Sequence, residues 1–315
     1  MVNKEISIKD EILKILFLAK GETVSGVRLS EMLNISRVAV WKHISSLKET
    51  GVDVESRPRG YALLNPDDLL LPFCFKAGFH DRIFHFQELE STMDQAKLLA
   101  KSQAPHLSVV IAENQTTGRG RLLRKWFSSR GGLWFTLILK PEIPPVLSYI
   151  YNFAASLCLS RTLNRLWDLD VKVKWPNDLL LNGQKLAGLL SEMETKGDMT
   201  EFLNIGIGLN VNNDPRQYEP KAISIKDVLN REVSRRFILE AFLSDFEDQI
   251  QTLDPETLIG LWKKQTATIG SRVRIETFGK IVEGLALDVD ETGALILRDN
   301  SGEIQKIIYG DCFHT

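Results

Sequence analysis

Residues 115–126 read QTTGRGRLLRKW and follow an apolar stretch at 108–113 that is typical of a buried strand. Between 114 and 130 the sequence has five Lys or Arg residues and no carboxylate. Glycines let backbone amides approach an anion closely, and arginines offer paired donors to phosphate oxygens. A flexible, solvated loop is the competing interpretation. A strand that leads into an anion-binding loop favours an α/β domain for this part of the chain.

A second group of motifs lies in residues 171–188, which read VKVKWPNDLLLNGQKLAG. Asn182 and Gly183 predict a two-residue hairpin turn, which places Lys185 beside that turn. A lysine in this position is usually solvated, but a site where phosphate charge develops needs one fixed cation. The glycines of GIGLN at 206–210 indicate close approach to a strand backbone. Core packing is the competing explanation, and an edge strand that mediates dimerisation is a further interpretation.

The motif STMD at 91–94 precedes a helical pattern. A Ser followed three residues later by an acid fits a capping box, which is the ordinary interpretation. The alternative is that free hydroxyls and amides at the helix start bind a small polar ligand. The sequence contains no GxxxxGK[ST] phosphate loop and no evident nucleophile set of the Ser-His-Asp or Cys-His type. These observations favour an enzyme that uses a nucleotide without a covalent enzyme intermediate.

The first sixty-five residues indicate a winged helix. Apolar residues recur at helical spacing in 8–19, 26–33 and 36–51, and a short hairpin follows with its turn at 57–60. The third helix and the hairpin turn carry cations suited to DNA phosphates, with no acid between 34 and 48. A helical module that packs against protein is the alternative. The DNA-binding candidates are Ser36, Arg37, Trp41, Lys42, Ser45, Arg57 and Arg59.

From Gly270 onward, short β-rich runs alternate with glycine-containing turns, which suggests a small barrel. The chain is therefore predicted to be an α+β protein of three domains. These are a winged helix-turn-helix at 1–65, an α/β catalytic domain with a mixed sheet at 66–267, and a β-domain at 268–315.

The composition is that of a globular protein, with 43% hydrophobic residues among 315. The net charge of -2 averages the basic helix and the cationic loop with acidic segments elsewhere. No apolar run approaches the roughly 18 residues of a membrane span, and Lys4 and Glu5 interrupt a signal-peptide pattern, so we expect a cytoplasmic protein with no membrane partner. Three distant cysteines predict neither disulfides nor a zinc site, and no metal-ligand set is expected among the histidines.

The motifs GRGR with RKW at 118–126, KWPND at 174–178, KLAG at 185–188 and GIGLN at 206–210 occur in this order. Together they resemble the signature of biotin protein ligases. With the winged helix in front, nearly the full length is similar to the bifunctional bacterial form, which is a biotin ligase and a repressor of the biotin operon. The resemblance implies a class II synthetase-like catalytic domain and an SH3-like C-terminal barrel.

The resemblance also implies a reaction. Biotin and ATP, with Mg²⁺, would form biotinyl-5′-adenylate, and a lysine of the biotin carboxyl carrier protein of acetyl-CoA carboxylase would then accept the biotin. The adenylate-bound form would dimerise and bind operator DNA. Biotin would contact Ser91, Thr92, Met93, Gln115, Arg119, Gly120, Arg121 and Lys185. ATP or the adenylate would contact Arg119, Arg121, Trp126, Asn177, Lys185 and Asn210. The catalytic candidates are Lys185, Arg121, Arg119 and Asp178.

Two residues depart from the family pattern. Met93 stands where Asn is frequent, so one polar contact to biotin would be missing or made by backbone. Leu123 stands where a glycine is usual, so the arginine loop would close differently over the adenylate. Two other functions stay open: a regulator that senses biotin without ligating it, and a lipoate or octanoate transferase of the same fold family.

Overall fold

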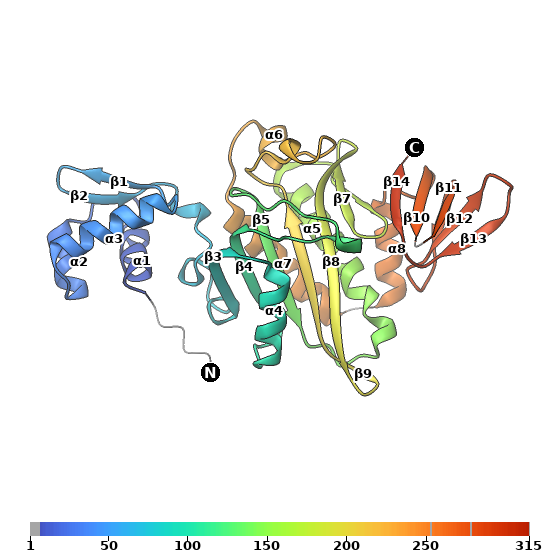
Figure 1. Cartoon of the computed structure of the whole chain (residues 1–315), viewed down its shortest axis with the longest axis horizontal. Coiled ribbons are helices and arrows are strands. Elements are labelled where there is room, and N and C mark those ends of the chain that lie inside the picture. Colours follow the sequence, from blue (N-terminus) through green and yellow to red (C-terminus); the bar gives the residue numbers. More distant parts are fainter. Residues whose placement is uncertain (1–6, 253, 278, 315) are drawn as a thin grey trace. The chain divides into compact units, whose positions relative to one another are not determined.

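The computed structural model describes residues 7–252, 254–277 and 279–314 (Figure 1). This description leaves out residues 1–6, 253, 278 and 315, which belong to the predicted domains, and the side chain of Leu123. The chain divides into two compact units, of which the first ends at Asp81 and the second begins at Arg82. The two boundaries between the three predicted domains stay a prediction. Among the described helices, none combines the length and the apolar character that crossing a membrane requires.

The first unit is the predicted winged helix. Ser7, Ser25 and Ser36 each precede a helix, and each side chain accepts a hydrogen bond from a backbone amide of the first turn, as N-caps do. Apolar residues from all three helices form one core with the hairpin. The elements are α1 (Ile8–Leu18), α2 (Gly26–Leu33), α3 (Arg37–Glu49), β1 (Val54–Arg57) and β2 (Gly60–Leu63).

The second unit is built on a 7-stranded mixed sheet in the order β3-β4-β5-β9-β8-β7-β6. Only the β3–β4 pair is parallel among these pairings. The strands are β3 (Ile83–Leu89), β4 (Ser108–Gln115), β5 (Leu133–Leu139), β6 (Lys172–Lys174), β7 (Asp178–Leu181), β8 (Gln184–Lys196) and β9 (Met199–Leu209). Gly206 and Gly208 lie on β9, between β5 and β8, so the interpretation of these glycines as part of an edge strand is wrong.

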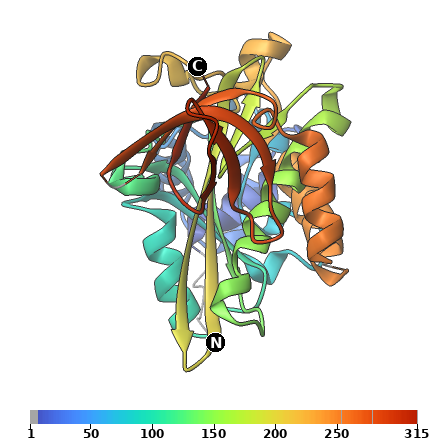
Figure 2. The ribbon, with the colours of Figure 1, turned by 90° about the vertical axis from the view of Figure 1, so that its right-hand side faces the viewer.

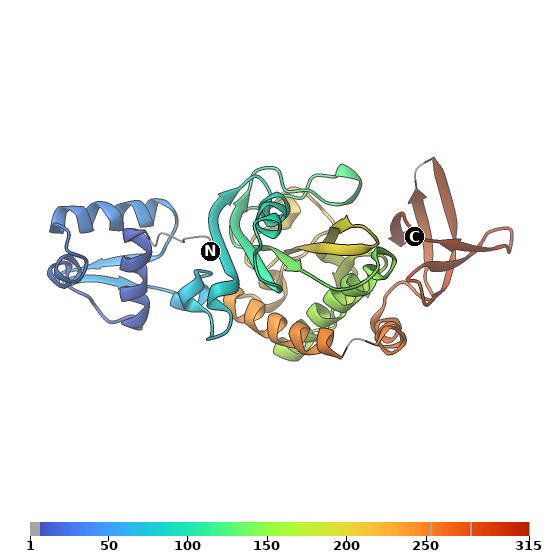
Figure 3. The same ribbon diagram turned by 90° about the horizontal axis from the view of Figure 1, so that it is seen from below.

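Helices cover both faces of this sheet (Figures 1 and 3). Thr136 on β5 donates a hydrogen bond to Thr92 at the start of α4, whereas its neighbour Phe135 packs edge-on against Phe242 of α7. Because successive side chains of a strand point to opposite faces, α4 and α7 lie on opposite sides of the sheet. The helices of this unit are α4 (Thr92–Lys101), α5 (Tyr149–Trp167), α6 (Ile225–Leu229), α7 (Arg235–Gln251) and α8 (Pro255–Gln265).

The C-terminal part is a 5-stranded antiparallel sheet in the order β13-β12-β11-β10-β14, which curves strongly in Figure 2. Its strands are β10 (Arg272–Thr277), β11 (Lys280–Val289), β12 (Leu295–Asp299), β13 (Ile304–Ile307) and β14 (Asp311–His314). Hydrogen bonds that attach it to the larger sheet domain include those from the Trp175 indole to the Gly293 carbonyl at 3.0 Å and from the Tyr149 hydroxyl to the Glu291 carbonyl at 2.6 Å. The predicted β-domain is therefore present and docked.

Candidate functional site

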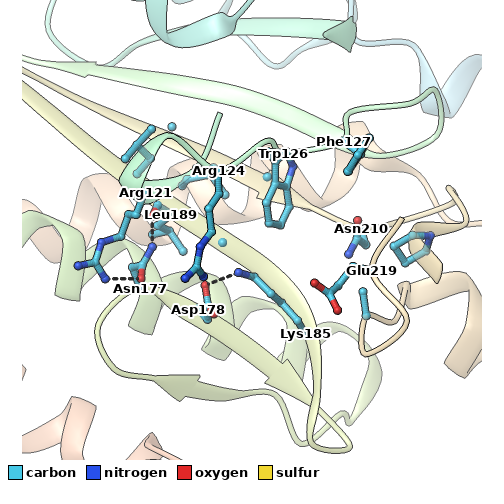
Figure 4. Close-up of a pocket in the computed structure, with 18 of the residues that line it drawn as sticks. Arg121, Arg124, Trp126, Phe127, Asn177, Asp178, Lys185, Leu189, Asn210 and Glu219 are labelled. Carbon is cyan, nitrogen blue, oxygen red and sulfur yellow. Dashed lines mark hydrogen bonds and ion pairs between the residues drawn. The ribbon is translucent and has the colours of Figure 1, made fainter. Parts of the chain in front are cut away.

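A cavity of about 450 Å³ lies between the arginine loop, the β7–β8 hairpin, the end of β9 and strand β14. Every ligand-site and catalytic residue that the sequence predicts lines this cavity. These residues are Ser91, Thr92, Met93, Gln115, Arg119, Gly120, Arg121, Trp126, Asn177, Asp178, Lys185 and Asn210. Segments that are far apart in the sequence thus converge on one space (Figure 4).

Lys185 is held in place by its side chain and by its backbone. Asn182 and Gly183 adopt positive φ angles of 53° and 74° and form the predicted tight turn. The Lys185 ammonium lies 2.9 Å from Asp178 Oδ1 and 5.3 Å from the centroid of the Trp126 ring, a cation–π distance (Figure 4). The backbone of Lys185 also pairs with the segment around Ala222. The predicted lysine is therefore a fixed cation in the cavity.

Two side chains that line the cavity pack against the glycines of the β9 motif. A Cβ at Gly208 would lie 2.4 Å from Trp126 Nε1, and a Cβ at Gly206 would lie 2.7 Å from the Met93 sulfur. Both contacts are too short for any other residue at these positions without a shift. The predicted close approach to the backbone is thus made by Trp126 and Met93, which pack directly against the sheet backbone because Gly208 and Gly206 have no side chains there.

Arg121 connects the arginine loop to the rest of the site. The loop contains a 3-10 turn, Arg121–Leu123, in which Leu122 has a positive φ of 53°. The Arg121 guanidinium donates to Asn177 Oδ1 and to the Gly310 carbonyl, both at 3.1 Å. Burial lowers the pKa of Arg121, and the carboxylates of Asp311 and Asp178 oppose that shift. A partly buried cation in this position suits an anionic ligand.

Arg119 is engaged by two carboxylates. Its guanidinium donates to Asp94 at 2.7 Å and to Glu192 at 3.3 Å. The Asp94 hydrogen bond raises the pKa of Arg119, and the charge of Glu192 acts in the same direction. The capping box predicted for residues 91–94 is not formed, because the Ser91 hydroxyl accepts from the Met93 amide and the Asp94 carboxylate binds Arg119 instead. Arg119 lines the cavity, but its charge is directed at these acids.

The predicted polar pocket at the start of α4 is buried and internally hydrogen-bonded. Gln115 Oε1 accepts from the Thr92 amide at 2.7 Å and from the Thr92 hydroxyl at 3.0 Å. The Gln115 side-chain amide donates to the Ser128 hydroxyl at 2.6 Å. Ser91, Thr92 and Met93 are each 3% exposed. This network fixes the hydroxyl and amide groups that would face a small polar ligand.

Two asparagines complete the predicted set. The Asn177 side chain accepts from Arg121 and donates to the Leu189 carbonyl (Figure 4). Asn210 is buried, and its side-chain oxygen accepts from Asn213 at 3.1 Å. Within the described ranges, no three His, Cys, Asp or Glu side chains gather into a group that could hold a metal ion.

The structure adds cavity residues that the sequence analysis did not select. Asp311 on β14 forms an ion pair with Arg124, and the Phe313 ring faces the guanidinium of Arg124 at 5.7 Å. Phe127 and Tyr218 stack at 4.1 Å between centroids. These contacts join residues separated by roughly ninety to one hundred and ninety positions. Because no local pattern connects such residues, only the five-cation count around Arg124 gave a signal in advance.

The DNA-binding candidates form two groups in the first unit. Arg37, Trp41 and Lys42 are exposed on α3, Ser45 is half-buried, and Ser36 serves as the N-cap. On the hairpin, Arg59 is exposed. Arg57 instead forms an ion pair with Glu55 and donates to Thr23 and to the Gly21 carbonyl. The structure thus places Arg57 in a hairpin-stabilising network.

Comparison with known proteins assigns each region to a described family. Residues 84–212 match the profile of the Biotin/lipoate A/B protein ligase family, residues 9–62 match an HTH domain, and residues 268–315 match the Biotin protein ligase C terminal domain. The Bifunctional ligase/repressor BirA of Bacillus subtilis is 32% identical over 97% of this chain and 98% of its own length. The Biotin--[acetyl-CoA-carboxylase] ligase of Mycobacterium tuberculosis is 34% identical over 65% of this chain and 78% of its own length.

A solved structure supports the fold. The biotin protein ligase from Aquifex aeolicus in complex with biotin and ATP superimposes with a TM-score of 0.65 at 23% identity, covering 74% of this chain and 99% of that one.

Proposed function

This chain belongs to the family of the bifunctional ligase/repressor BirA, and from that premise we propose that it is an ATP-dependent biotin protein ligase and a DNA-binding repressor. It forms biotinyl-5′-adenylate from biotin and ATP and then transfers biotin to a lysine of a biotin carboxyl carrier protein. The observation that carries the ligase function is the convergence of every predicted ligand-site residue on one cavity with a fixed lysine.

In the first half-reaction a carboxylate oxygen of biotin attacks the α-phosphorus of ATP, and the bond to the departing pyrophosphate breaks. Two anions must meet, so catalysis consists of positioning and charge neutralisation. Lys185 and Arg121 supply positive charge, and Asp178 orients the Lys185 ammonium. Mg²⁺ accompanies the nucleotide and neutralises charge on its phosphates.

We assign biotin to the polar pocket at the start of α4, and the adenylate to the aromatic wall, the part of the cavity that Trp126 lines. The buried hydroxyls of Ser91 and Thr92 and the half-buried side-chain amide of Gln115 suit the ureido head of biotin, because a site built for hydrogen bonds rejects analogues that lack them. Trp126, with Asn210 nearby, lines the adenylate side. Met93 contributes a buried thioether where a polar contact is frequent in the family, so the ureido contacts fall to the neighbouring groups.

In the second half-reaction a lysine amine of the carrier domain attacks the acyl carbon of the mixed anhydride, an amide bond forms, and AMP leaves. The test is incubation of the full chain with biotin, Mg-ATP and a biotin-carrier domain, followed by mass spectrometry of the carrier. We expect a mass increase of one biotinyl group. An unmodified carrier with normal pyrophosphate release would contradict only the transfer step. Absence of pyrophosphate release would contradict the ligase function as a whole.

Two other functions are separated by related measurements. A regulator that senses biotin without ligating it would bind biotin in calorimetry but release no pyrophosphate. A lipoate or octanoate transferase would be inhibited by free lipoate or octanoate in the same assay. The KWPND motif and the winged helix favour biotin over these acids. We therefore expect that free lipoate does not inhibit biotin transfer when it is added at the concentration at which biotin saturates the reaction.

The repressor function rests on the first unit. Its exposed α3 carries Arg37 and Lys42, and the hairpin carries Arg59, with no acid on the helix before Glu49. Contacts between cations and phosphates release counterions, so affinity for operator DNA falls as salt increases. A flat dependence of DNA affinity on salt would contradict this assignment.

The adenylate-bound form is a homodimer in this proposal. Strand β8 pairs with β7 up to Gly188 and, farther along, with β9 alone among the described strands. Its edge over residues 190–196 is therefore open, and an open edge is a template for pairing with a second chain. Sedimentation with and without biotin and Mg-ATP tests this, and an unchanged monomer mass would overturn it. Cytoplasmic location stays a prediction from the sequence.

A further inference from the structure

The exposed face of α3 has an unusual chemical pattern. Val38 is 63% exposed and Trp41 is 58% exposed, although both are large and apolar. Neither contributes to the core of the first unit, which takes its α3 residues from the opposite side of the helix: Val40, Ile44 and Leu47. Two apolar side chains are thus presented to solvent in the part of the chain that would contact DNA.

These side chains occupy the centre of the face, and cations occupy its edges. Successive residues of an α-helix are rotated by about 100°, which sets Arg37 and Lys42 roughly 140° apart. Trp41, Val38 and Ser45 fall between them on the same projection. Over residues 37–45 the face therefore has a cationic edge, an apolar centre with one hydroxyl, and a second cationic edge, whereas Lys48 and Glu49 project between the same edges at the C-terminal end of the helix.

This pattern matches the cross-section of the DNA major groove. Phosphates line both walls of the groove, and base edges form its floor. A helix that inserts this face directs its two cationic edges at the walls and its apolar centre at the base edges. Among the groups on the groove floor, the C5 methyl of thymine is the apolar one.

We propose that Val38 and Trp41 recognise thymine methyl groups, so that the operator carries T·A pairs opposite the centre of α3. This inference rests on the proposed repressor function and adds the base class that the site prefers. Charge complementarity favours DNA over a protein partner, because Arg37 and Lys42 flank the apolar pair on the helix and α3 has no acid in its first turn.

The test begins with selection of duplexes from a random pool by the full-length protein in the presence of biotin and Mg-ATP. In the selected duplex, each thymine of a half-site is then replaced by uracil, which removes only the methyl group. We expect the affinity for DNA to fall about threefold to fivefold at one or two positions, because this fold-change corresponds to the free energy of burying one methyl group. Uracil outside the half-sites serves as the DNA control.

The protein variants are Val38→Ala and Trp41→Ala, which fold because both residues are exposed. Each should bind the thymine duplex more weakly and lose its sensitivity to uracil at one position. The matched control is Leu18→Ala, which removes an equally exposed apolar side chain from α1.

The outcomes separate the inference from the repressor function. If no duplex is retained, the repressor function fails and the inference falls with it. If duplexes are selected and uracil has no effect, only the inference is overturned. Sensitivity to uracil that persists in both variants also overturns it, because other residues must then contact the methyl groups.

Discussion

The ammonium of Lys185 on β8 lies 2.9 Å from Oδ1 of Asp178, which is the first residue of the neighbouring strand β7. The Lys185 amide also donates to the Lys221 carbonyl at 2.9 Å, and the Ile223 amide donates to the Lys185 carbonyl at 3.0 Å. Contacts from separate segments thus fix this cation before any ligand binds. Charge that is already positioned stabilises a transition state without a reorganisation cost.

We predict that Lys185→Ala lowers the rate of adenylate formation on the order of a hundredfold or more, as loss of one preorganised transition-state donor does. Biotin-dependent exchange of pyrophosphate into ATP measures this step alone. Lys172→Ala is the control, because Lys172 pairs with Asp170 and does not line the cavity. An unchanged exchange rate in Lys185→Ala would refute the catalytic role.

Local patterns in the sequence were sufficient for parts of this site. The Asn182-Gly183 turn and the strand before the arginine loop follow from backbone preferences of a few neighbouring residues, and the structure confirms both. The resemblance to ligases supplied the cavity residues, whose roles stay proposals.

Other features depend on tertiary contacts that no local pattern contains. The contact between Asp311 and Arg124 joins the last strand to the arginine loop. The capping box failed because Asp94 had a competing partner, Arg119, twenty-five positions away. When a side chain has a local and a distant candidate partner, the sequence alone does not decide between them, because the position of the distant one depends on the tertiary fold.

The pairing of Arg119 with Asp94 and Glu192 leads to a second prediction. We expect Asp94→Asn and Glu192→Gln each to raise the KM for biotin about fivefold, because the arginine loop loses an anchor that is partly exposed and therefore worth about 1 kcal/mol. Glu194→Gln is the control, since Glu194 pairs with Lys97 and Lys101 instead. A lower KM in either variant would mean that these carboxylates compete with biotin for Arg119.

Gly208 provides a test of the aromatic wall. A Cβ at this position would lie 2.4 Å from Trp126 Nε1, so Gly208→Ala must displace the indole from the sheet. We expect a rise in the KM for ATP of about tenfold with a smaller change in the KM for biotin, because the proposed function assigns Trp126 to the adenylate side. Steady-state kinetics with each substrate varied measures both values.

Gly260→Ala is the matched control for this substitution. Gly260 lies within α8, and a Cβ there would meet nothing within 4 Å. Alanine in a helix interior is favourable by roughly 0.5–1 kcal/mol over glycine, so we expect unchanged kinetics and a slightly higher melting temperature. Equal KM values for Gly208→Ala and wild type would contradict the assignment of Trp126 to the nucleotide.

A buried ionic cluster outside the cavity gives the last prediction, which concerns stability and pH. Glu113 on β4 lies 2.7 Å from Arg235 at the start of α7 and accepts a hydrogen bond from His85 on β3 at 3.1 Å. Burial alone would raise the pKa of Glu113, but the His85 hydrogen bond and the Arg235 charge outweigh it and lower that pKa to about 2. The cluster ties α7 to two strands of the sheet.

A carboxyl whose pKa is lower in the folded chain stabilises the fold above its unfolded pKa, and this contribution is lost as the pH falls through the folded pKa. We therefore expect Glu113→Gln to destabilise the second unit by about 3 kcal/mol at pH 7, the range for breaking a buried ion pair. The difference from wild type should shrink between about pH 5 and pH 2. Urea unfolding followed by tryptophan fluorescence measures it, with Glu88→Gln, on the same sheet and exposed, as the control. A difference that stays constant over this pH range would show that the Glu113 charge does not stabilise the fold.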